Sequence, residues 1–61
     1  MTAEAWLERA RTEEEDDRAE EALEAAQRAL EADPNLAEAW RLKAGLLLDL
    51  DRTEEALALL A

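Results

Sequence analysis

Ala and Leu supply most of the apolar positions of the chain, and charged clusters divide these positions into successive stretches. Most of the remaining positions hold Glu or Arg, so nearly every residue type present favours an α-helix. One Gly and one Pro leave almost nothing to form the turns of a β meander. The pattern therefore predicts an all-α fold of about four helices, and the short segments between them require antiparallel neighbours.

The first helix is bounded by residues that suit its two ends. Thr2 has a hydroxyl group that can accept a hydrogen bond from a free amide of the first turn, so the helix is predicted over Ala3–Glu15. Acidic residues occupy every position in 13–17, where they oppose the negative end of the helix dipole. We therefore expect this helix to stop near Asp16.

Three further capping patterns predict where the remaining helices begin. In each pattern an Asp or Asn is followed three residues later by a Glu: Asp17 with Glu20, Asn35 with Glu38, and Asp51 with Glu54. The predicted helices cover about residues 18–32, 36–50 and 52–61. Pro34 ends the second of them, because its ring crowds the backbone of Asp33.

The chain repeats itself at an offset of 34 residues. The identical pairs are Ala3/Ala37, Glu4/Glu38, Ala5/Ala39, Trp6/Trp40, Ala10/Ala44, Asp17/Asp51, Arg18/Arg52, Glu20/Glu54, Glu21/Glu55, Ala22/Ala56 and Leu23/Leu57. They fall on capping, small and Trp positions in both helices of a pair, so chance and an Ala/Glu-rich composition explain them poorly. We call residues 3–36 unit one and residues 37–61 unit two, which is truncated relative to unit one.

A two-helix unit of about 34 residues resembles the tetratricopeptide repeat family. The matching residues are Trp6, Ala10, Ala22, Ala29 and Pro34 in unit one and Trp40, Ala44 and Ala56 in unit two, with residues 29–35 as the most specific segment. The resemblance implies one domain over residues 1–61, built of helical hairpins as a fragment of an α-solenoid. It also implies a non-catalytic module for protein–protein interaction.

Two positions depart from the family pattern. Unit one has Glu13 where the family commonly carries a large apolar residue, whereas unit two has Leu47 there. The family favours Gly at the turn within each hairpin, where this chain has Asp17 and Asp51. We therefore expect unit one to have a weakened core face.

The resemblance further implies a peptide-binding groove along the first helix of each unit. The matching positions hold Glu4, Leu7, Arg11 and Glu14 in unit one and Glu38, Arg41, Gly45, Leu48 and Asp49 in unit two. Gly45 would permit close approach of a partner's backbone, and Leu48 would supply an apolar contact. The acidic surroundings favour a peptide of basic or mixed charge. The alternative is that these residues simply form solvated helix faces.

The acidic balance of the chain narrows the range of partners. With 17 acidic and 7 basic residues the net charge is −10, which disfavours binding to nucleic acid and to anionic lipid. No apolar run approaches the about 18 residues of a membrane span, and no signal-peptide layout opens the chain. We therefore expect a soluble protein with a cytoplasmic location.

Few residues in the chain could carry chemistry. Cys, His and Tyr are absent, and the acidic run 13–17 lacks the glycine and the ligand spacing of a calcium loop. Lys43, the sole lysine, is expected to lay its stem along the core and keep its ammonium group in water. Trp6 and Trp40 are expected in the core rather than around an aromatic ligand. We therefore predict no catalytic activity, no cofactor and no metal site.

Unit two ends in an apolar stretch without a polar capping helix, so part of its apolar surface is expected to be exposed. The candidate residues are Leu36, Trp40, Leu47, Leu50, Leu57, Leu59 and Leu60. Because an exposed apolar patch of this kind marks an interface, we predict self-association as a two-fold homodimer. The alternatives are that the helices close on themselves and leave little exposed, or that the patch causes aggregation.

A second interpretation of the function is an engineered or structural scaffold that self-assembles and has no natural ligand. The amino-acid composition is narrow: it is dominated by Ala, Leu, Glu and Arg and contains no Phe, Tyr, His or Cys. This composition favours the second interpretation. The acidic run at a helix C-terminus and Glu13 at a core-facing position argue against it, because a designer would tend to remove both. The sequence leaves both interpretations open.

Overall fold

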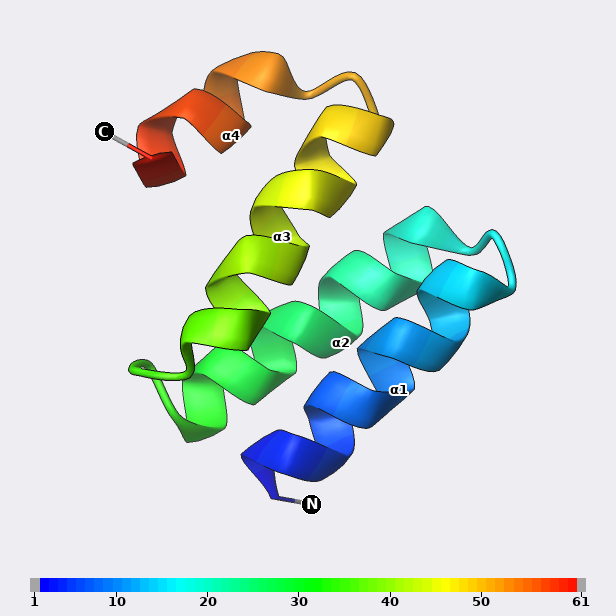
Figure 1. Ribbon diagram of the computed structural model, residues 1–61, viewed down its shortest axis with the longest axis vertical. Coiled ribbons are helices and arrows are strands. Elements are labelled where there is room, and N and C mark those ends of the chain that lie inside the picture. The colour runs from blue at the N-terminus through cyan, green and yellow to red at the C-terminus, as the bar shows by residue number, and fades with distance from the viewer. Residues whose placement is uncertain (1, 61) are drawn as a thin grey trace.

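The computed structural model describes residues 2–60, apart from the side chains of Thr53, Ala56, Leu59 and Leu60. The helices α1 (Ala3–Glu15), α2 (Ala19–Ala32) and α3 (Ala37–Asp49) have 13 or 14 residues each, and α4 (Thr53–Leu60) has 8 (Figure 1). The described residues contain no strand. The predicted all-α class is therefore confirmed for this part of the chain.

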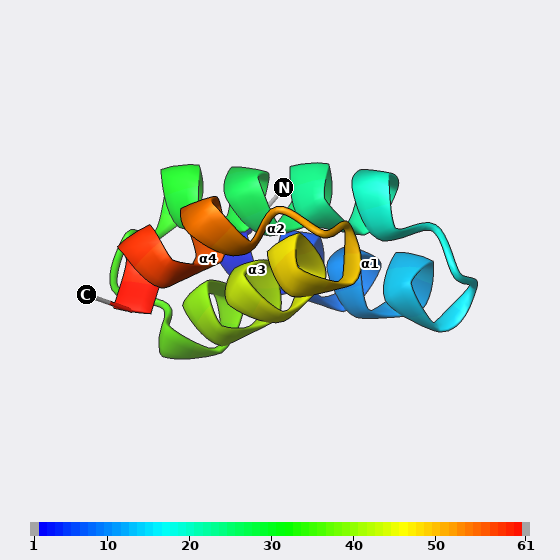
Figure 2. The same cartoon turned by 90° about the horizontal axis from the view of Figure 1, so that it is seen from above.

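The helices α1 and α3 lie in one layer and α2 lies in another, as Figure 2 shows. The helix α4 runs obliquely between the levels of α2 and α3. The helix α2 packs against both α1 and α3, whereas α4 packs against α3 alone. This arrangement of stacked hairpins leaves α1 at one end of the molecule and α4 at the other (Figure 1).

Small residues let the helices approach closely in the core. The fully buried alanines are Ala10, Ala22, Ala26, Ala29 and Ala39. Buried leucines join them in two clusters, and the third consists of alanines: Ala22, Leu23, Leu46 and Leu47; Leu7, Ala29, Leu30 and Ala39; and Ala10, Ala25 and Ala26. Leu42 packs against all three clusters, so α3 connects the cores of the two units.

Both ends of α1 lie where the sequence predicts them. Thr2 Oγ1 accepts a hydrogen bond from the N–H of Ala5 at 3.1 Å, which confirms the predicted cap. The helix ends at Glu15, and Asp16 is its C-cap residue. The acidic run therefore coincides with the end of the helix.

The turn within each unit has the same backbone geometry. Asp17 and Asp51 have positive φ angles of 64° and 62°, in the left-handed region. After α1 the N–H of Arg18 donates to the carbonyl of Glu13 at 2.8 Å, and the equivalent bond after α3 is 2.7 Å long. These bonds define a Schellman motif, which requires a left-handed residue at this position. The requirement explains why the family favours glycine there.

The predictions that Asp17, Asp51 and Asn35 cap the helices that follow them are wrong. A left-handed Asp closes the preceding helix instead of opening the next one, and the N-cap of α2 is Arg18. The N-cap of α3 is Leu36 rather than Asn35. Neither of these N-cap residues makes a side-chain capping hydrogen bond.

The connection between α2 and α3 starts at the predicted break. Asp33 has an extended backbone, with φ −146°, directly before Pro34. Its Oδ1 accepts a hydrogen bond from the N–H of Asn35 at 3.1 Å. Trp40 Nε1 donates a hydrogen bond to the carbonyl of Pro34 at 2.7 Å. This bond links the first turn of α3 to the segment that connects α2 and α3.

Candidate functional site

The predicted groove residues, with one exception, lie exposed or half-exposed on the outer surface of α1 and α3. We call this surface the α1–α3 face; its members are Glu4, Arg11, Glu14, Glu38, Arg41, Gly45, Leu48 and Asp49. Their helical spacing places them on one side of each helix. An ion pair between Arg11 of unit one and Glu38 of unit two joins the helices across this face. The structure thus brings together residues that are far apart in the sequence.

Leu7 is the exception, and the prediction that it lies in a groove is wrong. Its side chain is only 6% exposed and packs with Ala29, Leu30 and Ala39. The reason is that α2 and α3 meet over this part of α1. The side of α1 that faces outward in the other turns of the helix is therefore covered by α2 and α3 at Leu7.

Gly45 lies within α3 and has open space beside it. Apart from its two neighbours in the chain and the nearby backbone of the helix itself, no atom lies within 4 Å of the place that a Cβ would occupy, and φ is not positive. Neither packing nor backbone conformation therefore requires a glycine here. Leu48, one turn farther along, is 51% exposed. The two residues form an open apolar strip on the α1–α3 face.

The charges on the α1–α3 face are mixed, with an excess of acidic groups. The acidic members are Glu4, Glu14, Glu38 and Asp49, and the basic members are Arg11 and Arg41. Arg11 is engaged by Glu38, whereas Arg41 is exposed and forms no ion pair with another described side chain. A guanidinium group beside an apolar strip can hold a carboxylate or a carbonyl group of a partner.

Three of the predicted self-association residues belong to the packed part of the molecule. Leu47 is 1% exposed, within a core cluster. Leu50 and Leu36 are half-buried against the core clusters. The prediction is therefore wrong for Leu47, whereas Leu36 and Leu50 keep part of their surface exposed.

Two other predicted self-association residues are exposed. Trp40 on α3 is 39% exposed, and Leu57 on α4 is 58% exposed. We call these two residues the α3–α4 end. The predictions for Leu59 and Leu60 concern side chains outside the described part of the structure.

The two tryptophans differ in burial but share one feature. The Arg9 guanidinium lies 5.6 Å from the ring centroid of Trp6, and the Lys43 ammonium lies 5.4 Å from that of Trp40. Trp6 packs against two core clusters, which confirms its predicted place. The same prediction for Trp40 is wrong, because its side chain is 39% exposed.

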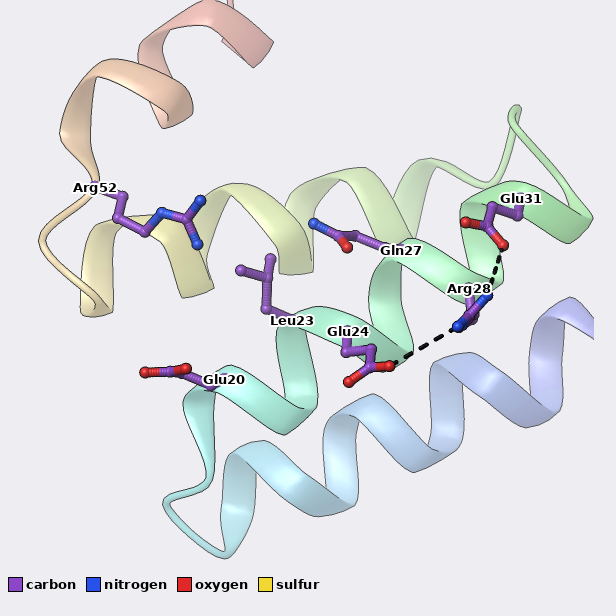
Figure 3. A pocket seen from close by; sticks show the side chains of 7 residues that line it. All are labelled: Glu20, Leu23, Glu24, Gln27, Arg28, Glu31 and Arg52. Atoms are coloured by element: carbon purple, nitrogen blue, oxygen red, sulfur yellow. Dashed lines mark hydrogen bonds and ion pairs between the residues drawn. The ribbon is translucent and has the colours of Figure 1, made fainter.

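A hollow of about 460 Å³ lies beside α2, away from the α1–α3 face (Figure 3). Its lining residues are Glu20, Leu23, Glu24, Gln27, Arg28, Glu31 and Arg52. Arg28 pairs with Glu24 at 3.9 Å and with Glu31 at 3.3 Å. Arg52 pairs with Glu55 at 2.7 Å. The walls are therefore mostly charged groups, of which Glu24, Arg28 and Glu31 pair with one another, and the hollow offers a ligand little apolar surface.

This side of α2 was not among the predicted sites, because the family resemblance points to the first helix of each unit. A signal was nevertheless present in the sequence. Glu20, Glu24, Gln27 and Glu31 recur at helical spacing and so line one side of α2.

Two kinds of site are not found in the part of the chain that the structure describes. No helix there is long and apolar enough to span a membrane. Among the same residues, no group of three or more acidic side chains is placed to hold a metal ion.

Stacked helical hairpins with an exposed outer surface define a class of protein, the helical-repeat interaction modules. The family model described as tetratricopeptide repeat matches residues 3–46, which include all of α1 and α2 and most of α3. The chain therefore belongs to the tetratricopeptide repeat family, a typically non-catalytic family of protein-interaction modules. Comparisons with curated proteins and with solved structures gave no significant match.

Proposed function

We propose that the chain binds an extended peptide segment of basic or mixed charge along the α1–α3 face. The observation that carries this proposal is Gly45, which lies in a helix interior where the fold itself has no need of a glycine. A glycine there costs about 1 kcal/mol of stability relative to alanine. A partner whose backbone must lie close against α3 explains why that cost is tolerated.

The groups around Gly45 suit such a partner. Leu48 offers an exposed apolar contact, and Arg41 offers hydrogen-bond donors for a carbonyl or carboxylate group. Glu14 and Asp49 are exposed on the same face and would attract lysine or arginine side chains of the peptide. The net charge of −10 adds a longer-range attraction for basic segments.

The substitution Gly45→Gln tests the proposal. Glutamine favours helix more than glycine does, so the variant is expected to unfold at a higher temperature while its longer side chain blocks the face. The probe is a set of labelled peptides of equal length that are lysine-rich, of mixed charge or glutamate-rich, titrated with fluorescence anisotropy. The wild type is expected to bind the first two, and Gly45→Gln to lose at least tenfold in affinity.

Ala32→Gln is the matched control, because it places the same side chain at an exposed position of α2, outside the α1–α3 face. It is expected to bind the peptides as the wild type does. The proposal is contradicted if no peptide in the set binds, or if Gly45→Gln binds as tightly as the control.

The second candidate function is a scaffold, engineered or structural, that self-assembles and has no natural ligand. The exposure of Trp40 and Leu57 at the α3–α4 end favours it, because large apolar side chains at one end of a repeat stack suit contact with another helix. Under this candidate, no peptide of any charge binds the α1–α3 face. The same titration therefore separates the two candidates.

A further inference from the structure

We infer that the peptide received by the α1–α3 face carries an acidic residue opposite Arg41 and a basic residue four positions away, opposite Asp49. This inference rests on the proposed function, because it specifies the charge pattern of the same ligand. The pattern follows from which charged side chains of the face already have a partner within the chain.

Arg41 differs from the other basic residues in having no partner. The chain has 7 basic residues in all. The others, which either pair with a carboxylate or lie against a tryptophan ring, are Arg9, Arg11, Arg18, Arg28, Lys43 and Arg52. Among the described residues, Arg41 alone makes neither kind of contact, and it is exposed. A strongly acidic chain thus leaves one guanidinium group open to a carboxylate of a partner.

The ion pair that crosses the α1–α3 face explains why Arg41 is unpaired. Side chains three or four positions apart on a helix are neighbours, and Glu38 is the only acidic residue within four positions of Arg41. Glu38 pairs instead with Arg11 of unit one. The fold therefore directs Glu38 towards α1 and leaves Arg41 available to a partner.

Asp49 is left unpaired in a similar way. Arg52 is the only basic residue within four positions of Asp49, and Arg52 pairs with Glu55 at 2.7 Å. Asp49 is exposed and is the last residue of α3, where the helix dipole disfavours a carboxylate. A lysine or arginine side chain of a partner would offset this unfavourable interaction.

The separation of these two open charges matches an extended chain. Arg41 and Asp49 are eight positions apart, so they are separated by about 12 Å along the axis of α3. Two side chains on the same side of an extended peptide, four positions apart, are separated by about 13 Å. Gly45 lies midway between the two charges, so the peptide residue between its own two charges meets the open apolar strip of Gly45 and Leu48.

This pattern distinguishes a peptide of mixed charge from a uniformly basic one. A lysine-rich peptide is attracted by Asp49 and by the net charge of −10, but it places like charges against Arg41. A peptide whose acidic and basic residues are four positions apart pairs with Arg41 and Asp49 at the same time. Removing the charge of Arg41 is therefore expected to affect the two kinds of peptide in opposite directions.

Three peptides of identical composition test the spacing. Each has blocked termini and carries one glutamate and one lysine among threonines and valines, which favour an extended conformation. The two charged residues are one, four or eight positions apart. Fluorescence anisotropy is expected to show that the wild type binds the four-position peptide at least about tenfold more tightly than the other two.

Arg41→Gln and Asp49→Asn test the two contacts, and each is expected to remove the preference for the four-position peptide. Arg41→Gln is also expected to tighten binding of the lysine-rich peptide by about twofold, because a like charge is removed. A variant that simply failed to fold would weaken both kinds of binding. The matched control is Arg28→Gln, which removes the same charge from an exposed position of α2 and is expected to keep the preference.

The double substitution of Arg41→Glu with Asp49→Lys exchanges the two charges and keeps the net charge. Because an extended peptide can lie on the face in either direction, this variant is expected to regain the preference that each single substitution removes. The inference is overturned if the wild type binds the three peptides alike, if Arg41→Gln keeps the preference, or if the exchanged variant lacks it.

The lysine-rich peptide distinguishes failure of this inference from failure of the proposed function. If the wild type binds that peptide and Gly45→Gln does not, while the spacing of charges has no effect, only the charge pattern is wrong. If neither the lysine-rich peptide nor any of the three peptides binds, the proposed function itself is contradicted, and the charge pattern with it.

Discussion

At the level of single residues, two aspartates hold a backbone conformation that few residues adopt. Asp17 and Asp51 have φ angles of 64° and 62°. The left-handed region costs an L-residue roughly 1–2 kcal/mol, with Asp and Asn tolerating it better than most, and glycine avoids this cost. Asp17 also adds negative charge at the C-terminal end of α1, where the helix dipole disfavours it.

We therefore predict that Asp17→Gly raises the free energy of unfolding by about 1 kcal/mol. Urea unfolding followed by circular dichroism measures the change. Asp17→Asn is the control, because it removes the charge while keeping a side chain that tolerates the left-handed region. If the charge alone were responsible, both variants would be equally stabilised. A loss of stability in Asp17→Gly would contradict this account of the turn.

Glu13 is the weak point in the core of unit one. It occupies the position equivalent to Leu47, which is 1% exposed. Its Oε2 is buried without a hydrogen-bond partner and lies 3.8 Å from the guanidinium group of Arg18. The carboxylate is thus partly removed from water with little compensation, which agrees with the weakened core face expected from the sequence.

Replacing this side chain by an apolar one is predicted to stabilise the fold. Glu13→Leu is expected to raise the free energy of unfolding by about 1–2 kcal/mol, because it buries apolar surface and removes the unsatisfied carboxylate. Thermal unfolding measures the effect. Glu15→Leu, a neighbouring exposed position, is expected to change stability by less than about 0.5 kcal/mol. Equal effects of the two substitutions would refute a specific role for position 13.

At the level of the elements, the link between α2 and α3 fixes how the two units meet. Asp33 Oδ1 accepts from the N–H of Asn35, and the Trp40 side chain donates to the carbonyl of Pro34. Both bonds lie between the end of one helix and the first turns of the next. They hold the connection in one conformation, so α3 returns alongside α2.

This geometry makes Asp33, and not Asn35, the residue whose side chain matters. Asp33→Ala is predicted to cost about 1 kcal/mol, because the N–H of Asn35 loses its acceptor. Asn35→Ala keeps that N–H and is predicted to change stability by only a few tenths of a kcal/mol. Chemical unfolding of the two variants side by side provides the comparison. A larger loss of stability in Asn35→Ala than in Asp33→Ala would contradict this account and support the capping role predicted for Asn35 from the sequence.

The helix bounds were well predicted from the sequence, while the details of the turns were not. Thr2 and Pro34 act through local sterics and hydrogen bonds, so their effect can be recognised from the chain alone. Asp17 and Asp51 suit either the start of a helix or a left-handed turn. Only the number of residues between the two helices of a unit decides which of these two roles each aspartate takes. Leu7 could not be placed in advance, because its burial depends on where α2 and α3 meet.

At the level of the whole molecule, two surfaces differ in their electrostatic character. The α1–α3 face is acidic in balance, whereas the α3–α4 end presents Trp40 and Leu57. They occupy different sides of the helix α3, since Trp40 lies on the opposite side from Gly45 in the helical repeat. In our proposed function the α1–α3 face receives a peptide, and in the second candidate function the α3–α4 end receives another copy of the chain.

The net charge of −10 predicts opposite responses of these two contacts to salt. Two copies repel each other, so raising the ionic strength is expected to tighten the dimer, while a lysine-rich peptide is expected to bind less tightly. Sedimentation equilibrium and anisotropy at several salt concentrations measure the two affinities. A dimer that weakens with salt would show that ion pairs, rather than apolar contact, hold it together.

The most direct measurement of the central claim is the affinity of the wild type and of Gly45→Gln for the lysine-rich peptide, by fluorescence anisotropy. The account predicts that the wild type binds this peptide and that Gly45→Gln loses at least tenfold in affinity. A wild type that takes up no peptide, or a variant that binds as tightly as the wild type, would contradict the claim that the α1–α3 face of this repeat module is an interaction surface.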